Sequence, residues 1–270
     1  MNRTVANNQP QATSENTVFL TVAAYPNYEV RTATLRKSAD DHGVSLVFCD
    51  TGEAWKGFYH HKIETMGEHL KRAREDGKHF AFILDSRDVV FIETIDTILA
   101  KWNALNDGRA MFNQDVPGKV WPSHKDYLAR AIGEAMGAEH ARLNAGMIAG
   151  NIDTILTIHH NTMELRRELK EGRPRPGMSE KLYQDIGTKH LCDDQHLYQI
   201  CLTYYPELFR IDCSKELFAV LKKYPQNLRG YSDDPKRHDV INNAAIVHSP
   251  WLSKNQQKWN DWVFQNRWKR

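Results

Sequence analysis

The chain has 270 residues, of which 41% are hydrophobic and 10% aromatic, and this apolar content excludes a wholly disordered protein. A formal net charge of only +2 excludes a globally basic nucleic-acid coat. No apolar run in the sequence approaches the roughly 18 residues that a membrane-spanning helix needs, so we expect no contact with a membrane.

The N-terminus is polar and lacks the apolar core of a secretion signal. We predict a flexible leader over residues 1–16, with order beginning near Thr17. The four cysteines form no CxxC pattern, which argues against a structural zinc centre and against a disulfide framework. A reducing cytoplasm is the expected location.

Strand and helix patterns alternate along the first half of the chain. β-Branched and apolar runs predict buried strands, and amphipathic stretches that stop at a glycine predict helices. The strands are expected at residues 17–24, 44–49, 79–84 and 89–92, and the helices at residues 28–42, 60–76 and 94–105. This alternation predicts an α/β protein with a Rossmann-like, mainly parallel sheet flanked by helices.

The second half is less regular. Apolar runs predict strands at residues 109–113, 143–150 and 244–248, and helical patterns cover residues 151–171 and 193–204. We expect one domain over residues 17–250, followed by a helix rich in aromatic and basic residues over 251–270.

Two carboxylates stand in a turn directly after a buried strand. Asp85 and Asp88 follow the apolar run at 79–84, and ligands of parallel sheets gather at the carboxyl ends of strands. Carboxylates three residues apart in a turn can converge on a hard divalent cation, which can neutralise the charge of a departing nucleotide diphosphate. The alternative is ordinary turn chemistry, in which aspartate is favoured.

Other polar and small residues mark the ends of predicted elements. His248 ends the last predicted strand, where a neutral imidazole can complete a metal site or serve a structural role. Asp193 and Asp194 open a helix, where they either complement the helix dipole or face a reacting centre. Asn144 and Gly146 lie in an apolar strand, where glycine indicates close approach of a ligand or tight packing.

Taken in order, these segments resemble the glycosyltransferase domain of the procollagen lysyl hydroxylases and collagen glycosyltransferases. The similarity covers residues 17–250 and implies a GT-A fold. The segments that carry it are VFLTVAA, Trp55 and Lys62, FILDSRDVVF, Val120-Trp121-Pro122, LNAGMIAG, Asp193-Asp194-Gln195, IDCSKELF and VHSP.

The resemblance implies a manganese (or magnesium) ion and a UDP-sugar donor. By the match, the metal ligands are Asp85, Asp88 and His248. Trp55 and Lys62 lie near the nucleotide or its phosphates, and Asn144 and Gly146 line the sugar pocket. Asp193 and Asp194 face the reacting centre, and Trp121 is an aromatic gate on the acceptor side. The family also implies retention of the anomeric configuration.

Two positions depart from the family pattern. Arg87 replaces an aromatic residue before the second aspartate. Its guanidinium either contacts phosphate, which assigns Arg87 to the donor site, or pairs with Asp88. The closing motif is His-Ser-Pro-Trp in place of His-Gly-Asn-Gly, which changes the expected shape of the diphosphate pocket.

Two basic segments bear on the acceptor. Residues 165–192 hold seven Lys/Arg against four acids, and residues 251–270 hold five against one. Such segments either meet nucleic-acid phosphates or form a solvated basic face. The leading hypothesis is therefore transfer to a hydroxymethylated pyrimidine in DNA. The alternatives are a protein hydroxylysine or saccharide acceptor, a metal-dependent hydrolase of nucleotide-sugars or nucleic acid, and a non-catalytic nucleotide-sugar sensor.

Overall fold

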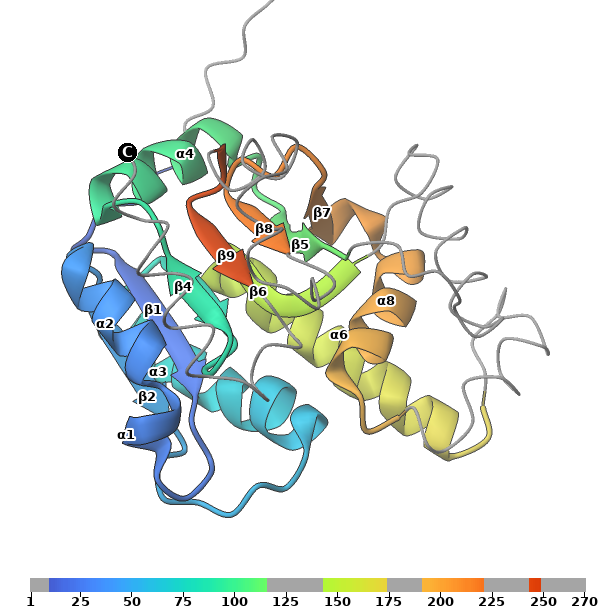
Figure 1. Ribbon diagram of the computed structural model, residues 1–270. Helices are drawn as coiled ribbons and strands as arrows, with labels where there is room; N and C mark the ends of the chain where they lie inside the picture. Colours follow the sequence, from blue (N-terminus) through green and yellow to red (C-terminus); the bar gives the residue numbers. More distant parts are fainter. Residues whose placement is uncertain (1–9, 116–142, 174–190, 221–242, 249–270) are drawn as a thin grey trace, which may run out of the picture.

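The computed structural model describes residues 10–115, 143–173, 191–220 and 243–248, and a six-stranded sheet forms its centre (Figure 1). The strand order is β2-β1-β3-β6-β5-β7. The strands are β1 (Thr17–Val22), β2 (Leu46–Cys49), β3 (Phe80–Leu84), β5 (Ala110–Gln114), β6 (Leu143–Asn151) and β7 (Phe209–Asp212). Only β6 runs against the others. The predicted α/β class and the mainly parallel sheet are therefore confirmed.

A second, three-stranded sheet has the order β4-β9-β8. Its strands are β4 (Val89–Phe91), β8 (Phe218–Val220) and β9 (Ile246–His248). The turn from Asp85 to Asp88 connects β3 of the large sheet to β4 of the small one. β4 and β9 are antiparallel and pair Val89 with His248, so the chain's last described residue lies beside this turn.

Alternation along the central strands gives the protein two cores. In β3, Ala81 and Ile83 belong to one buried cluster, whereas Phe80, Phe82 and Leu84 belong to the other, as expected for a strand buried on both faces. Phe82 stacks on the Phe19 ring of β1 with centroids 4.6 Å apart. Full burial of a phenylalanine contributes about 1.5–3 kcal/mol to folding.

Helices cover both faces of the sheet. On one face lie α3 (Met66–Glu75), α6 (Ile152–Lys170) and α8 (Asp194–Tyr204), with α6 and α8 side by side (Figure 1). The other face is covered by α2 (Ala33–Asp41), α4 (Ile95–Leu105) and the small sheet. Because the helices and the small sheet cover the faces, the carboxyl ends of β1 and β3 remain accessible at one end of the sheet.

Two helices differ from the expectation, one by a division and one by a π-helical first turn. The helix expected at 28–42 is divided at Thr32 into α1 (Tyr28–Arg31) and α2, because Thr32 leaves helical geometry at ψ 5°. The helix expected at 60–76 begins with a π-helical turn, η1 (His60–Thr65), before α3. β7, β8 and the 3-10 turn η2 (Pro206–Leu208) were not predicted.

The ordered chain begins earlier than the predicted leader allows. Ala12 is buried, its N–H donates to Asn103 Oδ1 at 2.8 Å, and its carbonyl accepts from Asn103 Nδ2 at 2.9 Å. These paired hydrogen bonds fix the chain to α4 before Thr17, so the flexible leader was predicted too long. Residues 1–9 and the helix predicted over 251–270 lie outside the described residues. Within the part that is described, no helix has the length and apolarity to cross a membrane.

Candidate functional site

A cleft of about 630 Å³ opens at the carboxyl ends of β1 and β3. Ten of the residues predicted for the site lie in the described part of the chain, and all ten line this cleft: Trp55, Lys62, Asp85, Arg87, Asp88, Asn144, Gly146, Asp193, Asp194 and His248. They come from segments far apart in the sequence. The eleventh, Trp121, lies outside the described residues. The roles of these residues stay predictions.

The acidic turn and the end of β9 form one group. Asp85 Oδ2 lies 3.4 Å from His248 Nε2, and Asp88 Oδ1 lies 3.5 Å from the same nitrogen. One ligand atom from each residue falls within 4.8 Å of the others. The pairing of Val89 with His248 produces this arrangement, because it sets the imidazole beside the carboxylate that precedes β4.

His248 is buried without a hydrogen-bond partner. Neither of its ring nitrogens donates to or accepts from another described residue, and only 2% of its side chain is exposed. Burial lowers the pKa of His248, but the carboxylates of Asp88 and Asp85 outweigh this effect and the pKa is raised. A single cation could contact all three groups, since one ligand atom from each lies within 4.8 Å of the others and the imidazole nitrogens have no hydrogen-bond partner among the described residues. Two oxygens and one nitrogen suit manganese or magnesium, so these residues fit the implied metal.

Lys62 links the acidic turn to helix α8. Its ammonium lies 2.6 Å from Asp85 Oδ1 and 3.0 Å from Asp194 Oδ2, and it donates to the Ala145 carbonyl at 3.1 Å. Burial lowers the pKa of Lys62, but the two carboxylates more than offset this and the pKa is raised. A charged lysine therefore holds Asp85 in place from the side away from His248 Nε2.

A bulge in β6 shapes the floor of the cleft. The pairing of β5 with β6 passes from Phe112↔Ile148 directly to Asn113↔Asn144, so three β6 residues have no partner on β5. The side chains replace the missing ladder: Asn144 Oδ1 accepts from Gly146 N–H at 2.9 Å, and Asn113 Oδ1 accepts from Met147 N–H at 3.1 Å. Bulges of this kind redirect the backbone next to active sites.

Asp193 and Asp194 occupy different environments at the start of α8. Asp193 is the N-cap and accepts from His196 N–H at 3.3 Å, and its carboxylate also lies 3.0 Å from His196 Nδ1. Asp194 is buried and pairs with Lys62. Both carboxylates line the cleft, and both already have protein partners.

Aromatic side chains form one wall of the cleft. Trp55 is 44% exposed, stacks on the His61 ring at 4.9 Å and meets the edge of Phe58 at 5.0 Å. His61 Nδ1 is in turn bonded to the carboxylate of Asp50 at 2.7 Å. Exposed, positioned aromatic faces of this kind can stack on a flat ligand ring. Phe58 was not predicted as a site residue.

A second aromatic, Tyr25, lies close to two guanidinium groups. Arg31 lies 5.5 Å and Arg87 5.7 Å from its ring centroid, and its hydroxyl lies 2.7 Å from Ser86 Oγ. Burial raises the pKa of Tyr25, so the hydroxyl stays neutral. Sequence reasoning missed Tyr25 and Arg31, although Tyr25 follows the first strand just as Asp85 follows the third.

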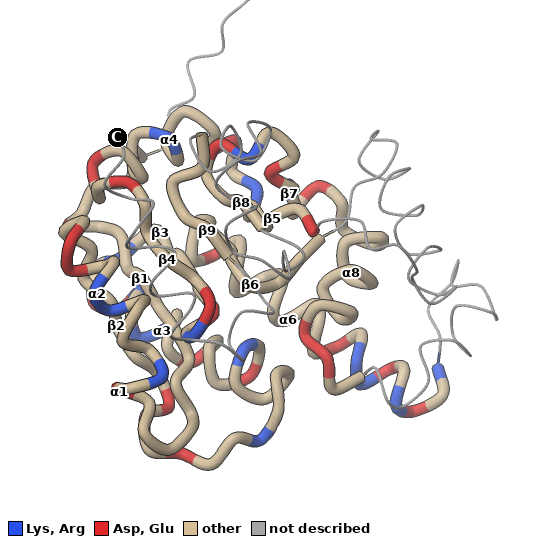
Figure 2. The backbone as a smooth tube through the Cα atoms, in the orientation of Figure 1, with Lys and Arg blue, Asp and Glu red and all other residues tan. Residues whose placement is uncertain are grey.

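The basic segment at 165–192 is described only at its two ends, residues 165–173 and 191–192. There, charges of both signs alternate along the end of α6 (Figure 2). The Arg166 guanidinium lies 3.6 Å over the Tyr59 ring and donates to the Leu191 carbonyl. Arg167 pairs with Glu164, and Arg173 pairs with Glu171. Arg166 is therefore engaged within the protein, whereas Arg167 and Arg173 make local ion pairs and stay more than half exposed.

The fold and the cleft are those of an α/β enzyme that binds its ligand where parallel strands end. The family model of the PLOD GT domain, the lysyl hydroxylase glycosyltransferase, matches residues 13–167, which is more than half of the 270 residues. The chain therefore belongs to this family and is a GT-A glycosyltransferase, as the resemblance predicted. Asp193, Asp194 and His248 lie beyond the matched segment, and the structure brings them to the same cleft as the matched residues.

A solved structure is similar in outline. It is the crystal structure of a glycosyltransferase involved in the glycosylation of the major capsid of PBCV-1. The similarity covers 91% of this chain and 98% of that one, with 12% identity and a TM-score of 0.48. No curated protein matches the chain.

Proposed function

We propose that the protein transfers a sugar from a UDP-sugar to an acceptor hydroxyl and that it requires manganese or magnesium. One observation carries this proposal: Asp85, Asp88 and the orphaned imidazole of His248 offer three ligand atoms within 4.8 Å of one another at the cleft. A cation held by these residues would supply positive charge to neutralise a departing diphosphate.

Lys62 keeps this ligand set in position. Its contact with Asp85 Oδ1 leaves Asp85 Oδ2, the oxygen nearer to His248, on the metal side. The Lys62 charge also offsets part of the negative charge that two carboxylates and a diphosphate would bring together. Trp55 and Tyr25 add aromatic rings to the lining of the cleft, where they can pack against the nucleotide, and Arg31 and Arg87 add positive charge nearby.

The stereochemical proposal is retention. Asp194 is held by Lys62, and Asp193 is held at the helix N-terminus by His196, so neither carboxylate is placed as an unengaged nucleophile. The bond from the anomeric carbon to the diphosphate then breaks as the acceptor oxygen bonds to the same face. The acceptor proton passes to a diphosphate oxygen of the leaving group. In this scheme Asp193 and Asp194 position the reactants.

A thermal-shift titration with UDP, GDP, CDP and ADP, each with and without manganese, tests the donor class. A ligand that binds only the folded protein raises the melting temperature by mass action. We expect a shift with UDP that depends on manganese. A larger shift with another nucleotide would reject UDP as the nucleotide of the donor. An equal shift with UDP in the presence of chelator would show that nucleotide binding does not require the metal.

For the acceptor, we carry forward the proposal of a hydroxymethylated pyrimidine in DNA. Support comes from the excess of Lys/Arg in residues 165–192 and 251–270. Arg166, held by the Tyr59 ring and the Leu191 carbonyl, contributes less to this surface than the sequence implied. Contact with DNA would therefore fall mainly to basic residues elsewhere in the two segments.

A further inference from the structure

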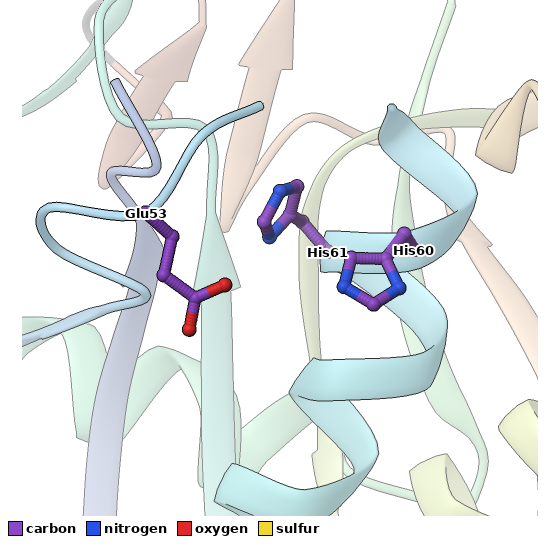
Figure 3. A group of neighbouring side chains, drawn as sticks. All are labelled: Glu53, His60 and His61. Atoms are coloured by element: carbon purple, nitrogen blue, oxygen red, sulfur yellow. The ribbon is translucent and has the colours of Figure 1, made fainter. Parts of the chain in front are cut away.

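A second group of ligand-type side chains lies in the chain segment that carries Trp55. Glu53 belongs to the loop after β2, and His60 and His61 belong to η1. One ligand atom from each of the three lies within 4.8 Å of the others. Figure 3 shows the Glu53 side chain extending from its loop toward the two imidazole rings.

A carboxylate holds each imidazole through Nδ1. His61 Nδ1 lies 2.7 Å from Asp50 Oδ2, and His60 Nδ1 lies 2.9 Å from Glu64 Oε2. An ionised carboxylate only accepts hydrogen bonds, so the proton belongs to Nδ1 in each ring. In the neutral rings Nε2 then carries a lone pair. Carboxylates bonded to histidine in this way are the usual outer partners of metal-binding imidazoles.

The local contacts show that the lone pair on His61 is in use. His61 Nε2 accepts from the Lys56 backbone N–H at 3.1 Å, and the Lys56 ammonium lies 3.5 Å from the Glu53 carboxylate. A divalent cation would replace both of these interactions with direct ligation. The Lys56 side chain is 57% exposed, so its ammonium would pass to water at small cost.

The π-helical turn brings the two neighbouring imidazoles together. Their ring centroids lie 4.9 Å apart at an interplanar angle of 76°. Single π-helical turns are rare and occur frequently at functional sites. A metal would bind in the plane of the His61 ring, which leaves the face of that ring to Trp55.

We propose that Glu53, His60 and His61 bind a second divalent cation, of the zinc class. Two imidazole nitrogens and one carboxylate oxygen are zinc ligands, whereas Asp85, Asp88 and His248 supply two oxygens and one nitrogen, which favours manganese or magnesium. Zinc at this place joins the loop after β2 to η1 and fixes the ring on which Trp55 rests. The site does not depend on the proposed donor or acceptor.

Equilibrium dialysis against zinc tests the site. It uses a variant in which metal binding by Asp85, Asp88 and His248 is weakened. Asp88→Asn is that variant, and alkylation beforehand removes the exposed thiols of Cys192 and Cys213 as competing ligands. His60→Gln is added in one variant and His160→Gln in a matched control, because His160 is an exposed histidine on α6 outside the group. Bound zinc per chain is then measured in both.

We expect the Asp88→Asn/His60→Gln protein to bind one zinc per chain fewer than the Asp88→Asn/His160→Gln protein. Glu53→Gln in place of His60→Gln should lower the zinc affinity at least tenfold. Zinc should also raise the melting temperature of the control by more than that of the His60→Gln protein. Equal zinc content in the two proteins would overturn the proposal, whether or not manganese binds at Asp85 and Asp88.

Discussion

Gly146 lies directly against the imidazole of His248. A Cβ built on Gly146 would come within 2.1 Å of His248 Cε1 and 2.3 Å of Nδ1, distances that no real side chain tolerates. The Gly146 carbonyl also accepts the Asp85 N–H at 2.8 Å. One backbone position on the β6 bulge therefore sets the place of two proposed metal ligands. The family resemblance implied a place in the sugar pocket for this residue.

Gly146→Ala should displace the His248 ring and lower manganese affinity about 10- to 100-fold, the usual effect of disturbing groups that orient metal ligands. Manganese titration of the folded variant checks this. Gly67→Ala is the matched control, since a Cβ there would meet His159 Nδ1 at an ordinary 3.8 Å. Affinity within twofold of wild type in Gly146→Ala would contradict the placement of His248 in the metal site.

Lys62→Met should abolish transfer and destabilise the fold by about 3–5 kcal/mol, because removing one member of a buried ion pair leaves unpaired charge. The double variant Lys62→Met/Asp194→Asn should regain part of the stability but none of the activity. Chemical denaturation of both single variants and the double variant gives the coupling energy. Strictly additive losses would show that Lys62 and Asp194 do not form the pair described here.

His159 makes stability depend on pH. Burial lowers its pKa from 6.5 to about 3, so between these values the unfolded chain takes up a proton that the folded protein does not. Stability is therefore lost as the pH falls below 6.5, by about 2 kcal/mol between pH 7 and pH 5 from this residue.

His159→Gln should remove that part of the acid sensitivity, whereas His160→Gln, at an exposed neighbour, should keep it. Denaturant unfolding of the three proteins at pH 7 and pH 5 provides the comparison. If all three proteins lose the same stability on acidification, His159 is not buried in its neutral form.

The fold was predictable where the local pattern was clear. Strand β3 is a continuous apolar run and helix α6 has 19 residues, and the structure places both within a residue or two of the expectation. β8 has only three residues and β7 only four, and both are stabilised by strands distant in sequence, so no local pattern reveals them. The reversed direction of β6 depends on pairing with β3 and β5, which a single strand does not encode.

The candidate site was predictable where a residue type that binds ligands occurs at a position where ligands bind. Asp85 and Asp88 are carboxylates at the end of a buried strand, which is a rule of parallel sheets. The β6 bulge was not predictable, because it arises from side chains of Asn113 and Asn144 that replace ladder hydrogen bonds. Tyr25 gains its place through Ser86 and two arginines, contacts that only the tertiary structure creates.

If DNA is the acceptor, binding should weaken steeply with salt, because each phosphate contact releases counterions. Affinity for hydroxymethylated and unmodified duplexes, measured between about 50 and 200 mM salt, should fall by at least tenfold for a protein with several such contacts. Transfer to saccharides or hydroxylysine peptides that is unaffected by salt, with no transfer to DNA, would reject this acceptor.

Donor turnover in Asp88→Ala is the most direct test of metal-dependent sugar transfer. UDP release from UDP-sugars is measured with manganese and with chelator, for wild type, Asp88→Ala and Asp40→Ala, an exposed aspartate on α2. We predict that chelator and Asp88→Ala each lower turnover by about 10²–10³-fold, the scale of lost electrostatic stabilisation of a leaving group, and that Asp40→Ala matches wild type. Near-normal turnover by Asp88→Ala in manganese would contradict a metal site at Asp85, Asp88 and His248.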